Sequence, residues 1–141
     1  MKSDHTLLAP VVGLVLWTFV IWTWMYVTRI PAIRQARMRL DPTAPRGEQM
    51  ALLPPRVRWK ADNYNHLMEM PTLFYAVALA LAVANDTSSA SIALAWAYVA
   101  LRVVHSLVQV LWNNIVVRFS LFFVSSLLLL ALTIRAALLV F

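Results

Sequence analysis

Long apolar stretches separated by polar connections dominate this chain. Residues 7–27 carry no charged side chain, and this stretch is long enough to cross a hydrocarbon core of about 30 Å as a helix. Further apolar stretches follow at residues 70–84, 92–112 and 119–141, and charged side chains interrupt them at few positions. The pattern predicts an all-α integral membrane protein whose lipid-facing fold is a bundle of four transmembrane helices.

The polar connections set the expected helix bounds. We expect one membrane domain over residues 1–141, with helices over about 6–28, 57–84, 90–112 and 115–140. The first helix lacks a small-residue cleavage site, so we expect it to be retained and not removed as a signal peptide. The long first connection, about residues 29–56, contains several prolines that interrupt any long helix.

Composition and charge give the expected topology. The chain is 62% hydrophobic and 13% charged, which lies outside the range of ordinary soluble domains. Eight of its twelve basic residues lie between residues 29 and 60, so the positive-inside rule places the first connection in the cytoplasm and both termini outside. No aromatic residues alternate with these charges in a recognised motif, which argues against a nucleic-acid partner.

The third helix carries a polar stripe. Its polar residues recur at helical spacing and share one face between Val, Leu and Trp residues: Arg102, His105, Ser106, Gln109 and Asn113. A charge at membrane depth costs from about 2.5 to more than 10 kcal/mol, so it usually faces the protein interior or a wet cavity. The stripe predicts a buried site for an anionic ligand, although its Ser and Gln are also typical of interhelical hydrogen bonds.

A similar polar face follows the second helix at Asp62, Asn65, His66, Glu69 and Thr72. Glu69 either forms a structural ion pair with an arginine of a later helix or binds a ligand ammonium while the arginines bind ligand carboxylates. Neighbouring arginines would repel a cation, and a second carboxylate and histidine pair is missing. We therefore expect no metal site.

Further arginines lie near the helix ends. Arg118 opens the fourth helix, where it either extends to the membrane interface or faces the ligand site. Arg34 and Arg37 follow the first helix, and Arg135 is expected to anchor the fourth helix at its other end. Because the chain has no cysteine, any thiol chemistry needs a thiol from a bound cosubstrate.

These features resemble the MAPEG family, the membrane-associated proteins of eicosanoid and glutathione metabolism. The resemblance rests on the four-helix layout, the segment NHLMEMP at 65–71, and the segment RVVHS at 102–106 followed by Arg118. It covers nearly the whole chain. It implies a homotrimer that binds glutathione between neighbouring subunits near the cytoplasmic side, in a bacterial inner membrane.

The resemblance also implies residue roles. Glu69 corresponds to the carboxylate that binds the glutamyl ammonium, and Arg102 to an arginine that binds the peptide. Arg118 corresponds to the arginine at the thiol end and is the expected catalytic residue, because a nearby cation raises the thiolate fraction. The implied glutathione-binding residues are Arg34, Arg37, Asn65, His66, Glu69, Arg102, Ser106 and Gln109.

The chain departs from the family pattern at three positions. The family usually has Asn three residues before the Glu of the second helix, where this chain has His66 and places Asn65 one residue earlier. Gln109 and Phe122 stand where several members carry tyrosine, so two hydroxyl donors are missing.

Two functions follow. The first is a glutathione-dependent membrane transferase or peroxidase that acts on lipophilic electrophiles from the lipid bilayer. The aromatic residues of the first helix and an apolar groove between subunits would receive the hydrophobic small molecule. The alternative is a non-catalytic membrane protein that uses the same trimer scaffold to bind an anion or a lipid headgroup. A channel is less well supported, because inverted repeats and broken helices are not indicated.

Overall fold

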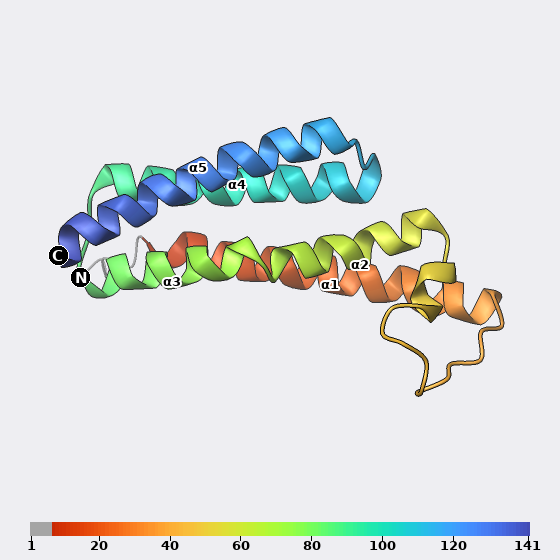
Figure 1. The fold of residues 1–141 in the computed structure, drawn as a ribbon. Helices are drawn as coiled ribbons and strands as arrows, with labels where there is room; N and C mark the ends of the chain where they lie inside the picture. The colour runs from red at the N-terminus through yellow and green to blue at the C-terminus, as the bar shows by residue number, and fades with distance from the viewer. Residues whose placement is uncertain (1–6) are drawn as a thin grey trace.

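In the described part of the chain, five α-helices are arranged in two layers (Figure 1). One layer contains α1 together with α2 and α3, and the other contains α4 and α5. The computed structural model describes residues 7–141. Its elements are α1 (Leu8–Gln35), the short 3₁₀ helix η1 (Gln49–Leu52), α2 (Pro55–Leu67), α3 (Met70–Val83), α4 (Ser89–Leu111) and α5 (Ile115–Val140).

Among residues 7–141, four helical spans are long and apolar enough to cross a membrane: Leu8–Gln35, Pro55–Val83, Ser89–Leu111 and Ile115–Val140. The outward surfaces of these spans carry many exposed large apolar side chains, as a hydrocarbon environment allows. The prediction of an all-α membrane protein with four transmembrane helices is confirmed.

The first helix is longer than expected. It continues past residue 28 to Gln35, so Pro31 lies inside it, and its expected start at residue 6 lies outside the described residues. A proline near the end of a long helix removes one of many hydrogen bonds, and the helix continues for one more turn. The first connection therefore covers residues 36–54, not 29–56.

The second span is broken into two helices, which corrects the expected continuous helix over 57–84. α2 ends at Leu67 and α3 begins at Met70. Pro71 explains the break, because it has no N–H to donate to the carbonyl of Leu67 and its ring crowds the preceding turn. Glu69 lies in the break as the N-cap of α3, with φ −90° and ψ −104°.

Apolar side chains from both layers form the core. Leu14 and Ile21 of α1 and Leu132 of α5 are fully buried. Phe74 of α3 stacks on Tyr98 of α4 with ring centroids 4.6 Å apart, and this pair joins the layers. In a bilayer such packing, more than transfer out of water, holds helices together.

Arg135 makes hydrogen bonds to the start of α4, a role that its expected anchoring function did not include. Its Nε donates to Ser91 Oγ and its Nη2 to Ser88 Oγ, both at 2.8 Å. Ser91 Oγ also donates to the Asp86 carboxylate. Burial alone would raise the pKa of Asp86, but hydrogen bonds from Ser91 and Ser88 and the charge of Arg135 hold that pKa below its ordinary value. We call these four residues the Arg135 clasp.

Candidate functional site

The break after α2 gives Arg102 its partner. Arg102 is 0% exposed and lies between α2 and α4. Its Nη2 donates to the main-chain oxygen of His66 at 3.2 Å. That carbonyl is in the last turn of α2, where the helix dipole is negative and a cation is favoured. The buried guanidinium is therefore stabilised by a helix end, without a carboxylate.

Several buried polar side-chain atoms of α2 and α4 lack a hydrogen-bond partner within residues 7–141. They include Nε and Nη1 of Arg102, Oγ of Ser106, Oε1 of Gln109 and both polar side-chain atoms of Asn63. An unpaired buried polar group costs about 1–3 kcal/mol, so such groups usually bind water or a ligand. This arrangement suits a site that is completed by polar ligand groups or ordered water.

Asn63 was not predicted as a site residue. It is fully buried on α2 and lies three residues before His66, so the two side chains share a face of the helix. Its position at the same spacing as His66 and Glu69 is the signal that could have identified it. The sequence places Asp62 and Thr72 on the polar face with His66, but in the structure Asp62 is exposed on α2 and Thr72 lies in α3, beyond the break.

Glu69 pairs with His66 and with neither arginine. Its Oε2 lies 2.9 Å from Nδ1 of His66, a contact that is an ion pair when the imidazole is protonated and a hydrogen bond when it is neutral. The Glu69 side chain is 66% exposed, so most of its carboxylate is accessible. The interpretation that Glu69 neutralises Arg102 or Arg118 is therefore wrong for this structure. The carboxylate remains able to bind an incoming cation.

A cavity of about 230 Å³ lies next to the end of α2; we call it the Arg118 pocket. Its walls are His66, His105, Ile115, Arg118, Phe119 and Phe122. The His66 ring centroid lies 4.9 Å from that of His105 and 5.4 Å from that of Phe122. The pocket thus combines one guanidinium, two imidazoles and aromatic surface.

The turn between α4 and α5 holds Arg118 in place. Asn113 adopts a left-handed conformation with φ 55°, which Asn tolerates better than most residues. Its Oδ1 accepts a hydrogen bond of 2.6 Å from Nη1 of Arg118. Asn114 caps α5 by accepting from the Val117 amide at 3.1 Å. Arg118 Nε is buried and has no partner in the described part of the chain.

The remaining predicted residues lie in three places. Ser106 and Gln109 are buried on α4, on the face that carries Arg102. Arg34 lies in the last turn of α1 and Arg37 lies just beyond it with φ 50°; both are exposed and neither lines the Arg118 pocket. Asn65 is next to His66 in sequence but points to a different side of α2.

Asn65 lines a separate hollow of about 410 Å³ that three arginines surround. They are Arg29 of α1, Arg46 of the first connection and Arg58 of α2. The sequence did not single out Arg46 or Arg58. Arg46 lies in an irregular connection, so no helical spacing predicts that it packs near Arg29 and Arg58. Only the three-dimensional structure shows that the three arginines lie together.

The comparisons with known proteins bear on this arrangement. The model of the MAPEG family matches residues 7–138. The chain belongs to the MAPEG family. No curated protein and no solved structure matches it. The family confirms the resemblance drawn from the sequence and makes the chain a multi-pass membrane protein of the kind involved in glutathione and eicosanoid metabolism.

Proposed function

We propose that this MAPEG protein is a glutathione-dependent membrane transferase or peroxidase that acts on lipophilic electrophiles. The Arg118 pocket is the observation that carries the proposal. In it, the Arg118 guanidinium lies among two imidazoles, beside the exposed carboxylate of Glu69. This set of charges complements a zwitterionic thiol peptide.

Arg118 is the proposed catalytic residue. The thiolate is the reactive form of a thiol, and a nearby cation lowers the thiol pKa. Asn113 holds one guanidinium nitrogen of Arg118, which fixes the positive charge in the wall of the pocket, next to the proposed position of the sulfur. In the transferase reaction the sulfur forms a bond to the electrophilic carbon. The leaving group departs with its electron pair, and the thiol proton passes to solvent.

Glu69 and the arginines bind the rest of the peptide in this proposal. The exposed carboxylate of Glu69 takes the glutamyl ammonium, and its contact with His66 orients it. Arg102 positions the end of α2 through the bond from its Nη2 to the His66 carbonyl. Its Nε and Nη1, which have no partner within residues 7–141, are proposed to bind the peptide. The exposed Arg34 and Arg37 of a neighbouring subunit in the homotrimer bind the carboxylates.

The alternative is a non-catalytic protein that binds an anion in the same pocket. One observation favours it: Phe122 forms a wall of the pocket, where several family members carry a tyrosine. A phenyl ring cannot donate a hydrogen bond to a thiolate or to a leaving group.

Conjugation of a chlorinated nitroaromatic by the purified protein tests the proposal. We expect glutathione-dependent product and chloride release by the wild type, and a rate at least about tenfold lower for Arg118→Gln, as one lost charge-assisted contact implies. Arg39→Gln, which removes an exposed arginine outside the Arg118 pocket, is the matched control and should keep the wild-type rate. Glutathione binding without turnover of any electrophile would support the non-catalytic alternative. If glutathione does not bind at all, both the catalytic and the non-catalytic use of glutathione are refuted.

A further inference from the structure

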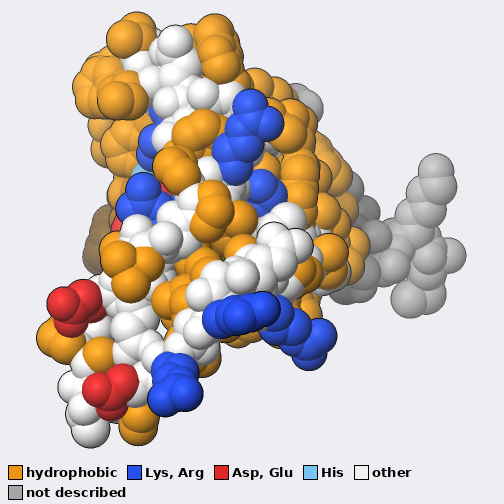
Figure 2. Space-filling model, turned by 90° about the vertical axis from the view of Figure 1, so that its right-hand side faces the viewer, with side chains coloured by type: hydrophobic (Ala, Val, Ile, Leu, Met, Phe, Trp, Pro, Cys, Tyr) orange, Lys and Arg blue, Asp and Glu red, His pale blue; other side chains and the backbone are white. Residues whose placement is uncertain are grey.

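The arginine hollow is a second basic site, on the side of α2 that faces α1. Figure 2 shows Lys and Arg side chains gathered over the end of the molecule that carries the first connection. Arg29, Arg46 and Arg58 line the hollow, and Asp62 is the one carboxylate among its lining residues. The Nε atoms of Arg29 and Arg58 are buried and unpartnered within residues 7–141. Three guanidinium groups and one carboxylate give the hollow an excess of positive charge that suits an anion.

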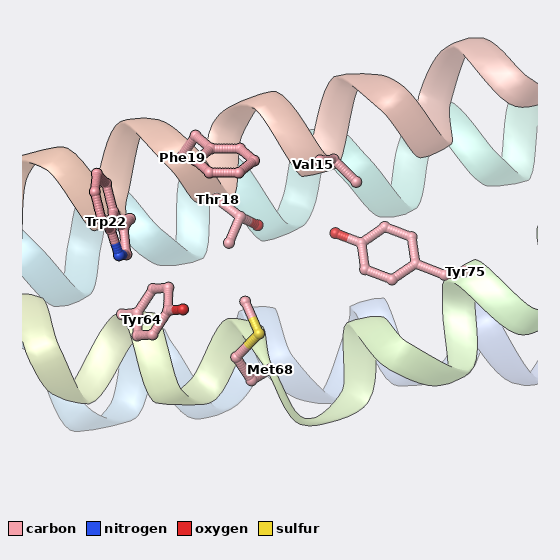
Figure 3. Close-up of a pocket in the computed structure, with 7 residues that line it drawn as sticks. All are labelled: Val15, Thr18, Phe19, Trp22, Tyr64, Met68 and Tyr75. Atoms are coloured by element: carbon pink, nitrogen blue, oxygen red, sulfur yellow. The ribbon is translucent and has the colours of Figure 1, made fainter.

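An apolar pocket of about 200 Å³ lies along the same two helical spans (Figure 3). α1 contributes one wall, and α2 and α3 contribute the other; the lining residues are Val15, Thr18, Phe19, Trp22, Tyr64, Met68 and Tyr75. None of them is charged. Phe19 is 61% exposed and Trp22 is 42% exposed, so the pocket is open to the outside of the single chain.

The hollow and the apolar pocket are aligned along one seam between α1 and α2. On α1, Trp22 precedes Arg29 by seven residues, and on α2, Tyr64 follows Arg58 by six. At about 1.5 Å per residue, both helices place the aromatic residue about 10 Å deeper in the membrane than the arginine. α1 and α2 run in opposite directions, yet on both helices the arginine lies closer to the membrane surface than the aromatic residue. The positively charged hollow therefore lies between the membrane surface and the apolar pocket.

We propose that this seam binds an anionic lipid, with its phosphate in the arginine hollow and an acyl chain in the apolar pocket. Guanidinium groups bind phosphate oxygens through paired hydrogen bonds, and three of them surround the hollow. The apolar pocket offers no charged partner, so a wholly hydrophilic ligand would leave it unused, whereas a hydrocarbon chain fills it. The lipid links Arg46 of the first connection to α1 and α2 and so stabilises that connection.

The lipid site is independent of the Arg118 pocket. The two sites share no lining residue and lie on different sides of α2, Asn65 facing one and His66 the other. Arg58 and Arg118 therefore provide separate variants for the two ligands. Loss of lipid binding and loss of glutathione binding can be distinguished in the same preparation.

Delipidated protein in detergent can be titrated with phosphatidic acid, phosphatidylcholine and glycerol phosphate, with complexes counted by native mass spectrometry and stability followed by thermal unfolding. We expect phosphatidic acid to bind and to raise the unfolding temperature. Arg58→Gln should weaken its binding about tenfold, the effect of one charge-assisted hydrogen bond. Arg56→Gln, two residues earlier on the same helix and outside the lining of the hollow, should change binding less than about twofold.

Two further comparisons separate the parts of the lipid. Trp22→Ser should weaken binding of phosphatidic acid and leave binding of glycerol phosphate unchanged. Equal binding of phosphatidylcholine, equal affinity for glycerol phosphate and for the lipid, or no effect of Arg58→Gln would overturn the proposal. Displacement of the lipid by glutathione, with lost glutathione binding in Arg58→Gln and retained binding in Arg56→Gln, would also overturn it, because the hollow would then belong to the thiol site.

Discussion

Arg102 shows how far a single residue can be understood from sequence. Its cost in hydrocarbon and its place in a polar stripe predict burial in the protein interior, and it is fully buried. Its partner could not be predicted in the same way, because that partner is the main-chain carbonyl of His66 at a helix end. Side-chain spacing carries no information on which main-chain atoms a break will leave unpaired.

Arg102→Met tests the positioning role of this residue. The substitution removes the bond to the His66 carbonyl, and we expect glutathione to bind about tenfold more weakly. The free energy of unfolding should change by less than about 2 kcal/mol, since the variant also removes two unpartnered buried nitrogens. Calorimetric titration and thermal unfolding measure the two effects. Wild-type affinity in a folded Arg102→Met protein would show that Arg102 has no such role.

The Arg135 clasp gives a pH prediction at the residue scale. Because the folded-state pKa of Asp86 lies below its ordinary value of 3.8, the stability that Asp86 contributes is present above that value and is lost as pH falls through the lower folded-state pKa. The unfolding temperatures of the wild type and of Asp86→Asn should therefore differ near neutral pH and converge in strong acid. A difference that stays constant with pH would contradict the role of the ionised carboxylate.

At the scale of elements, the lengths of the apolar stretches are sufficient to predict four membrane-spanning segments. They do not predict where a segment is broken into two helices. Pro71 breaks the second span, whereas Pro31 stays inside α1. Both residues remove one hydrogen bond, so the sequence gives them similar weight. The difference is that the break at Glu69 also gains the contact between Arg102 and the end of α2, which depends on a helix far away in sequence.

Pro71→Ala should join α2 and α3 into one helix. The N–H of residue 71 would then bond to Leu67 and continuous turns would replace the break, so Glu69 would leave its present position. We expect glutathione affinity to fall at least about tenfold, with unchanged or higher thermal stability. Pro31→Ala in α1 is the control and should keep wild-type affinity. Equal affinities in both variants would mean that the break does not shape the site.

The Arg135 clasp joins α5 to the start of α4, and we expect this contact to contribute to stability. Arg135→Gln loses at least one of two hydrogen bonds to Ser88 and Ser91, which should lower stability by about 1–3 kcal/mol. Glutathione binding should be unchanged, because the clasp shares no residue with the Arg118 pocket. Thermal unfolding in detergent, together with calorimetry, checks both statements; an unaltered unfolding temperature would show that the clasp is dispensable.

At the scale of the whole molecule, the homotrimer and the sharing of the site between subunits remain predictions. Within one chain, His66, Glu69 and Arg118 come together, whereas Arg34 and Arg37 do not line the Arg118 pocket. No pattern within a single chain specifies which surface a second copy covers. The proposed carboxylate contacts therefore depend on the neighbour.

Mixed trimers test this sharing. A variant lacking both Arg34 and Arg37 and a variant lacking Arg118 should each be inactive alone. If the site spans two subunits, random mixing of equal amounts restores about one quarter of the sites, those in which an intact Arg118 meets an intact neighbour. Activity of co-expressed subunits measures the recovery. Absence of any recovery, with trimers present by native mass spectrometry, would place all the contacts within one subunit.

The most direct test of the glutathione proposal is the ultraviolet absorbance of thiolate when reduced glutathione binds to the purified protein near neutral pH. We predict a thiolate signal of about one per occupied Arg118 pocket in the wild type and in Arg39→Gln, and a strongly reduced signal in Arg118→Gln at equal occupancy. Bound glutathione that remains a neutral thiol in the wild type, or an equal thiolate signal in Arg118→Gln, would contradict the role of Arg118 as the residue that activates the cosubstrate.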